Sequence, residues 1–201
     1  MSARRFTIVG VRAPSGSRAK RSRTALVLVD VINHMDFTDG SLLAREAEPI
    51  APSLLRLRSA AHRAGCPVIY ANDNFGDWCA TSREIVTFCQ RGRNGGAFTR
   101  RVRPLKNDLF VLKARNSAFY CTSLEPLLEA FGVRTLVLGG LTADNCVLFT
   151  AHDAYLRGLR LVVPEDGVAA VHREATERAL QQMRAVLKAR TPPAASVEFR
   201  A

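Results

Sequence analysis

The sequence lacks the cysteine and histidine patterns that build disulfide frameworks or structural zinc sites. Its 201 residues contain five cysteines, an odd number, and no C-x-x-C pair. The four histidines show no ligand spacing to one another or to the cysteines. We therefore expect neither a disulfide scaffold nor a structural metal, and the composition favours a cytoplasmic location.

Long apolar runs are also missing. No run approaches the about 20 residues that cross a bilayer, and the longest, such as 25–29, have the length of a strand. We therefore expect no membrane partner. The segment VINHMDF at 31–37 contains no glycine, which argues against a dinucleotide-binding turn there. With 47% hydrophobic residues, the chain has the composition and length of one globular domain.

Acidic residues are absent from the first 23 positions, which hold seven of the 29 basic residues. Residues 24–201 carry the other 22 basic residues and all 18 acidic ones, so most of the net charge of +11 belongs to the N-terminal arm. We interpret 1–23 as a basic, flexible arm and 24–201 as one domain. The arm lacks the apolar segment of a secretory signal, whereas an organelle transit peptide stays a less favoured alternative.

Short apolar runs alternate with segments of helical spacing along this domain. We expect strands at 24–30, 67–71, 108–113, 134–140 and 159–163, and a short edge strand at 196–199. Helices are expected at 49–64, 82–90, 123–131, 145–157 and 172–189, and the glycine-rich, basic segment 91–106 is expected to be irregular. This alternation predicts a three-layer α/β/α fold with a mostly parallel sheet of five or six strands.

Three reactive side chains follow strands of this predicted sheet. Asp30 ends the first strand, Lys113 ends the third, and Cys146 follows the fourth after a Gly-Gly turn. Open parallel sheets bind ligands at the carboxyl ends of their strands, so these side chains are expected to meet. A carboxylate can accept a thiol proton, and an ammonium group can support both anions, which indicates nucleophilic catalysis by Cys146.

The position of Cys146 in the first turn of a predicted helix adds to this interpretation. Unpaired N–H groups and the helix dipole favour an anion there, so we expect a lowered thiol pKa, with Asp144 as the N-cap. The other four cysteines are interpreted as inert.

Three segments around these residues resemble the signatures of isochorismatase-like cysteine hydrolases, a superfamily that includes nicotinamidases and related amidohydrolases. They are TALVLVDVINHMDF at 24–37, VLKARNSAFYCT at 111–122 and LVLGGLTADNCVLFTAHDAYLRG at 136–158. The resemblance implies that Cys146 is the nucleophile, Asp30 its base and Lys113 the supporting cation. It also implies a cis peptide bond between Leu141 and Thr142, and an oxyanion hole formed by the N–H groups of Thr142 and Cys146.

The sequence departs from the family pattern at two places. The segment before the nucleophile often has a small residue, Thr and Asp in the family, whereas Thr142, Ala143 and Asp144 stand here. Nicotinamidases of the family carry an Asp and two His as metal ligands after the second strand, but NDNFGDW at 72–78 has no histidine. We therefore expect no metal and no other cofactor, and nicotinamide is a poor substrate candidate.

These features favour a hydrolase that cleaves a C–N bond of a small amide or carbamoyl-type metabolite through a thioester. One alternative is vinyl-ether hydrolysis of the isochorismatase type, which needs no cysteine nucleophile. Another is a non-catalytic or nucleic-acid-binding module that uses the basic arm and segment 91–106. The arm has no aromatic residue beyond Phe6 and no DNA-binding motif, so specific nucleic-acid binding is not expected.

The expected partners are a small-molecule substrate and further copies of the chain, in a dimer or tetramer. Four residues that follow strand ends are candidates for the wall of the substrate pocket: Phe37, Asn74, Trp78 and Phe119. Phe37 and Phe119 fit equally well as core aromatics.

Overall fold

The computed structural model describes residues 21–201, and its centre is a six-stranded sheet in which every strand pair is parallel. The strands are β1 Thr24–Val29, β2 Val68–Asp73, β3 Leu109–Lys113, β4 Thr135–Leu141, β5 Arg160–Val162 and β6 Val168–Ala169. Their order is β3-β2-β1-β4-β5, and β6 pairs with β4. The predicted α/β fold is confirmed. The predicted arm lies outside the described residues except for residues 21–23.

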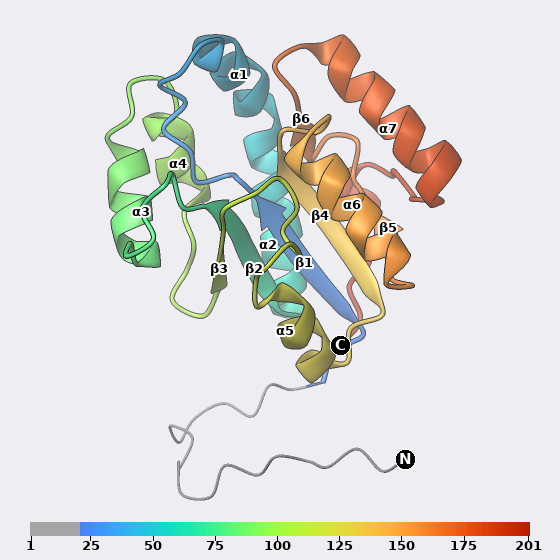
Figure 1. The fold of residues 1–201 in the computed structure, drawn as a ribbon. Coiled ribbons are helices and arrows are strands. Elements are labelled where there is room, and N and C mark those ends of the chain that lie inside the picture. Colours follow the sequence, from blue (N-terminus) through green and yellow to red (C-terminus); the bar gives the residue numbers. More distant parts are fainter. Residues whose placement is uncertain (1–20) are drawn as a thin grey trace, which may run out of the picture.

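Helices cover both faces of the sheet (Figure 1). They are α1 Gly40–Ala47, α2 Ala51–Arg63, α3 Ser82–Gln90, α4 Gly96–Val102, α5 Leu124–Phe131, α6 Cys146–Leu156 and α7 Arg173–Leu187, with 3₁₀ turns η1 Glu48–Ile50 and η2 Ala194–Ser196. No helix within residues 21–201 is long and apolar enough to span a membrane.

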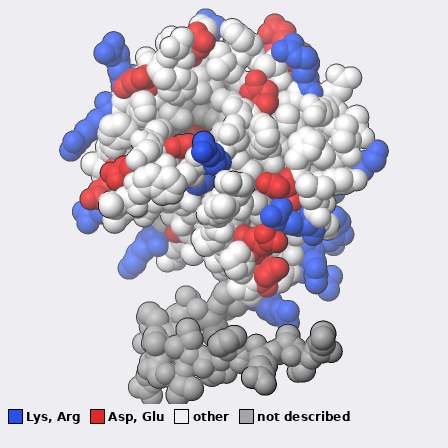
Figure 2. Space-filling view, viewed as in Figure 1, with Lys and Arg blue, Asp and Glu red and all other residues white. Residues whose placement is uncertain are grey.

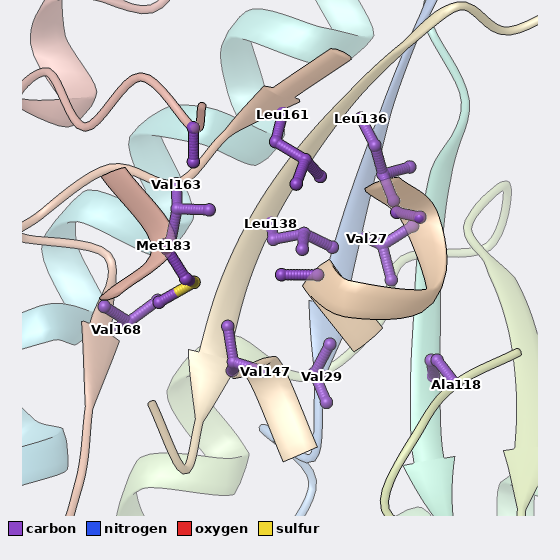
Figure 3. Packing of buried hydrophobic residues seen from close by; sticks show 14 of the residues in the cluster. Val27, Val29, Ala118, Leu136, Leu138, Val147, Leu161, Val163, Val168 and Met183 are labelled. Atoms are coloured by element: carbon purple, nitrogen blue, oxygen red, sulfur yellow. The ribbon is translucent and has the colours of Figure 1, made fainter. Parts of the chain in front are cut away.

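The alternation of side chains along β1 divides the core into two clusters. Ala25, Val27 and Val29 pack in the cluster that α5, α6 and α7 cover, whereas Leu26 and Leu28 face the cluster under α1 to α4. Figure 3 shows side chains of the first cluster, among them Val147 of α6 and Met183 of α7. Burial on both faces explains why β1 is a continuous apolar run.

Four features differ from the sequence-based expectations. The structure adds α1 and the two-residue β6, and the segment expected to be irregular at 91–106 contains α4. No strand forms at 196–199, where the structure has η2 and then a segment without regular structure. Arg190 takes the place beside β5 instead, since its N–H donates to Leu161 and its carbonyl accepts from Val163.

Gly140 is the position in β4 at which a side chain is least tolerable. Its φ is 119°, and a Cβ there would overlap with the Val29 carbonyl on β1. Such close approach lets β1 and β4 lie side by side up to the edge of the sheet where both strands end.

We expect Gly140→Ala to lower the free energy of unfolding by roughly 3 kcal/mol, since it combines backbone strain with overpacking. Gly158→Ala is the matched control, because Gly158 also has a positive φ of 72° but nothing lies within 4 Å of its Cβ position. The control should cost about 1 kcal/mol. Urea unfolding checks both values, and equal losses would contradict this account.

Candidate active site

The ammonium group of Lys113 lies between the side chains of Asp30 and Cys146, the two residues that were predicted to meet it. Its Nζ is 2.8 Å from the Asp30 carboxylate and 3.6 Å from Cys146 Sγ, and it donates to the Arg115 carbonyl at 3.1 Å. Lys113 is 1% exposed and Asp30 6%. These contacts use all three N–H donors of the ammonium group, so its position is determined by the carboxylate, the thiol and the backbone.

Asp30 is held by the neighbouring strand. It follows β1 in a left-handed conformation with φ 49°, and its Oδ1 accepts the Asp73 N–H at 2.8 Å. The buried Asn72 side chain holds the following turn, because it accepts from the Ile32 N–H at 3.1 Å and donates to the Ile32 carbonyl at 2.6 Å. β2 therefore positions both the carboxylate and the loop that leaves it.

Segment 91–106 supports the loop after β1 from the other side. The Gly95 N–H donates to the His34 carbonyl at 2.8 Å, and Thr99 Oγ1 bonds both the N–H and the carbonyl of Asn33. A Cβ at Gly95 would overlap with the Asn33 carbonyl oxygen. The glycines that suggested an irregular loop allow this close backbone approach instead.

Cys146 is the first residue of α6, and Asn145, rather than the expected Asp144, occupies the N-cap position. The Asn145 side chain accepts a hydrogen bond from Asn116 Nδ2, which joins the start of α6 to the segment after β3. The peptide bond between Leu141 and Thr142 is cis. Within residues 21–201, the N–H groups of Thr142 and Cys146 donate no hydrogen bond, so both are unpaired.

The charges of the site set the protonation of its members. Burial raises the pKa of Asp30, and the Lys113 charge only partly opposes this. Burial lowers the pKa of Lys113, but the nearby Asp30 and Cys146 raise it by more, so the pKa lies above its ordinary value. Burial and the Asp30 carboxylate raise the pKa of Cys146 to about 12, against the lowering effect of Lys113. The expectation of a lowered thiol pKa is therefore wrong, because burial and a neighbouring anion oppose the effect of the helix start and favour the protonated thiol.

The four residues expected to line a substrate pocket lie in different environments. Phe37 is 47% exposed and Trp78 81%, and Phe37 packs edge-on against His34. Asn74 is buried, and its N–H donates to the Lys113 carbonyl. Of the four, Asn74 is thus the one that forms a hydrogen bond to a residue of the Asp30–Lys113–Cys146 group.

Phe119 belongs to the hydrophobic core, with the Arg157 guanidinium 4.7 Å from its ring centroid. It lines a cavity of about 410 Å³ with residues such as Gly132 and Leu159, near the amino ends of β4 and β5. The interpretation as a core aromatic holds, and the expectation of a pocket wall at the carboxyl edge does not.

Sequence reasoning missed the carboxylate of Asp73, which lies 3.9 Å from Lys113 Nζ. The register of β2 and β3 pairs Asp73 with Lys113, a relation that only strand alignment reveals. Within residues 21–201, no group of three or more His, Cys, Asp and Glu side chains is arranged to hold a metal ion. Phe75, two residues after the end of β2, packs against His34.

Together these features define a parallel α/β protein with a thiol, an ammonium group and a carboxylate at one edge of its sheet. Figure 2 shows a hollow near the carboxyl ends of the central strands, where acidic and basic side chains meet. Residues 24–192 match the family model of the isochorismatase domain. The chain therefore belongs to the isochorismatase family of hydrolases.

Several known proteins are similar to this chain. The uncharacterized isochorismatase family protein YaaI of Bacillus subtilis is 39% identical over 163 residues, which cover 81% of this chain and 90% of YaaI. The maleamate amidohydrolase of Pseudomonas putida is 28% identical over 162 residues, which cover 77% of this chain and 76% of that protein. The crystal structure of N-carbamoylsarcosine amidase from Thermoplasma acidophilum superposes with a TM-score of 0.69 at 31% identity, covering 88% of this chain and 99% of that one.

Replacing Asp30 with Asn should separate thiol reactivity from catalysis. The Asp30 charge raises the Cys146 pKa, so Asp30→Asn lowers this pKa and leaves Lys113 to stabilise a thiolate. At neutral pH, we expect iodoacetamide to alkylate Cys146 at least about tenfold faster than in the wild type, since one pKa unit changes the thiolate fraction tenfold. Peptide mass spectrometry measures the rate, and exposed Cys79 and Cys121 are internal references. An unchanged or slower alkylation of Cys146 would contradict the assigned electrostatics.

Proposed function

We propose that this chain is a cysteine hydrolase that cleaves a C–N bond of a small amide or carbamoyl-type metabolite through a thioester on Cys146. The observation that carries the proposal is the chain of contacts from the Asp30 carboxylate through Lys113 to the Cys146 thiol, 2.8 and 3.6 Å long. A buried base next to a resting thiol suits general-base activation on substrate binding.

In the first step, Asp30 takes the thiol proton as Cys146 Sγ attacks the carbonyl carbon. The carbonyl oxygen becomes an oxyanion, and the free N–H groups of Thr142 and Cys146 form the oxyanion hole. The C–N bond then breaks, the electron pair goes to the nitrogen, and the proton on Asp30 follows it. The products of this step are an amine or ammonia and a thioester.

In the second step, water attacks the thioester while Asp30 again acts as the base. The C–S bond breaks, the acid leaves, and the proton returns to the sulfur, which restores the resting thiol. Lys113 is next to the sulfur in both steps and offsets negative charge on either partner. A positive charge fixed by three contacts needs little reorganisation during the reaction.

The relatives support this reaction class. The maleamate amidohydrolase and the N-carbamoylsarcosine amidase are named for the hydrolysis of an amide and of a carbamoyl compound. We extend that class, but neither particular substrate, to this chain. A cytoplasmic location and a homo-oligomeric assembly stay predictions.

Cys146→Ala should abolish hydrolysis of every amide substrate, because no thioester can form. Ammonia release from a panel of small amides, ureas and lactams measures this. The Asp30→Asn, Cys146→Ala double variant should be no worse than Cys146→Ala alone, since residues that act as a unit show non-additive losses. Lys113→Ala should also be inactive. A substrate that Cys146→Ala still hydrolyses at the normal rate would indicate cysteine-independent vinyl-ether chemistry instead.

The nucleic-acid alternative predicts a different outcome for the arm. Basic and acidic side chains are interspersed over the face shown in Figure 2, and they form no continuous basic patch on this face. We expect deletion of residues 1–20 to leave hydrolysis unchanged and to remove any weak, salt-sensitive DNA binding. A gel-shift titration at two salt concentrations tests this, and tight, sequence-selective binding that survives the deletion would contradict the enzyme proposal.

A further inference from the structure

Asp73 is a second carboxylate at the proposed catalytic group, and the mechanism above does not use its side chain. It is the last residue of β2, paired in register with Lys113 on β3. Its side chain is 40% exposed, whereas those of Lys113 and Asp30 are 0% and 8% exposed. Asp73 is thus the one of these three charged groups that is open to solvent.

The two oxygens of Asp73 have different surroundings. Oδ1 accepts the Phe75 N–H at 2.6 Å, which closes a local turn and fixes the orientation of the carboxylate. Oδ2 lies 3.9 Å from Lys113 Nζ, too far for a hydrogen bond, and the three donors of Lys113 are used elsewhere. Within residues 21–201, no group donates to Oδ2. The fold therefore orients an anionic acceptor at the site and leaves it without a donor.

Resting on the proposed function, we propose that Asp73 Oδ2 accepts a hydrogen bond from the N–H of the scissile nitrogen and so selects substrates that release ammonia or another amine with N–H groups. As the C–N bond breaks, the nitrogen takes up the thiol proton from Asp30, and its N–H groups become stronger donors. A fixed carboxylate binds such a group more tightly in the transition state than in the substrate. Primary amides and ureido groups fit this site, whereas esters and tertiary amides have no N–H to offer.

The division between the two carboxylates follows from their contacts. Asp30 is buried, bonded to Lys113 and raised in pKa, which suits proton transfer. Asp73 is half-exposed and has a free oxygen, which suits recognition of the nitrogen. A purely indirect role of Asp73 through Lys113 would affect every step equally, whereas contact with the nitrogen affects only steps in which a C–N bond forms or breaks.

The reverse reaction isolates this contact without knowledge of the natural substrate. p-Nitrophenyl acetate acetylates Cys146, the protein is desalted, and loss of the acetyl group is followed by intact mass in water and with added hydroxylamine. Hydroxylamine carries N–H groups and attacks the thioester along the path by which an amine leaves, forming a C–N bond as the C–S bond breaks. Water forms no C–N bond, so it provides the comparison in the same sample.

In Asp73→Asn, we expect the hydroxylamine-dependent loss to slow about tenfold and the water-dependent loss to stay within about twofold, the scale of one charge-assisted hydrogen bond. Asn retains the acceptor for the Phe75 N–H, so the local turn is kept. Asp77→Asn is the matched control, because exposed Asp77 accepts the Cys79 N–H in a similar turn of the same loop, and both rates should stay unchanged. Asp73→Ser, which also removes the charge, should repeat the effect.

Three outcomes would overturn the inference, and only one of them would also overturn the proposed function. Equal slowing of both rates would mean that Asp73 acts through Lys113, and unchanged rates would mean that it does not contact the nitrogen. Both leave the cysteine mechanism intact. Failure of the wild-type protein to become acetylated at Cys146 would instead overturn the proposed function, and this inference with it.

Discussion

A buried ammonium group is the constraint on which the site depends. Lys113 lies almost without exposure between a carboxylate and a thiol, and an isolated buried charge of this kind costs several kcal/mol. The Asp30 ion pair, the Arg115 carbonyl and the Cys146 sulfur satisfy its three donors. Loss of one charged partner from a buried pair typically costs about 3–5 kcal/mol, so the same contacts that assemble the site also stabilise the edge of the sheet.

The parallel sheet explains why three residues distant in sequence can meet around that charge. β1, β3 and β4 all end at one edge, so the side chains that follow them converge there without any long loop. The apolar runs and the acid or lysine that closes each run are visible in the sequence. For this reason the parallel sheet and the grouping of Asp30, Lys113 and Cys146 were predictable before the structure.

Other parts of the fold depend on contacts that no local pattern reveals. β6 has two residues and exists because it pairs with the end of β4, and α4 forms within a glycine-rich segment because Gly95 and Thr99 hold the loop after β1. Phe119 comes soon after β3 in the sequence, which suggested a place at the carboxyl edge of the sheet. Its ring is instead buried in the core, next to residues near the amino ends of β4 and β5. The register of β2 and β3 likewise places Asp73 next to Lys113, and the register of two strands cannot be determined from one sequence alone.

The thiol pKa shows how a correct local argument can give the wrong sign. A helix start does favour a thiolate, but Cys146 is also partly buried and close to Asp30, and these two effects dominate. A permanently ionised thiolate would compete with Asp30 for the charge of Lys113. Keeping the proton on sulfur preserves the Asp30–Lys113 pair at rest, and the proton is then available for the leaving nitrogen. The elevated pKa of Cys146 is therefore consistent with a nucleophile that ionises only as the substrate is attacked.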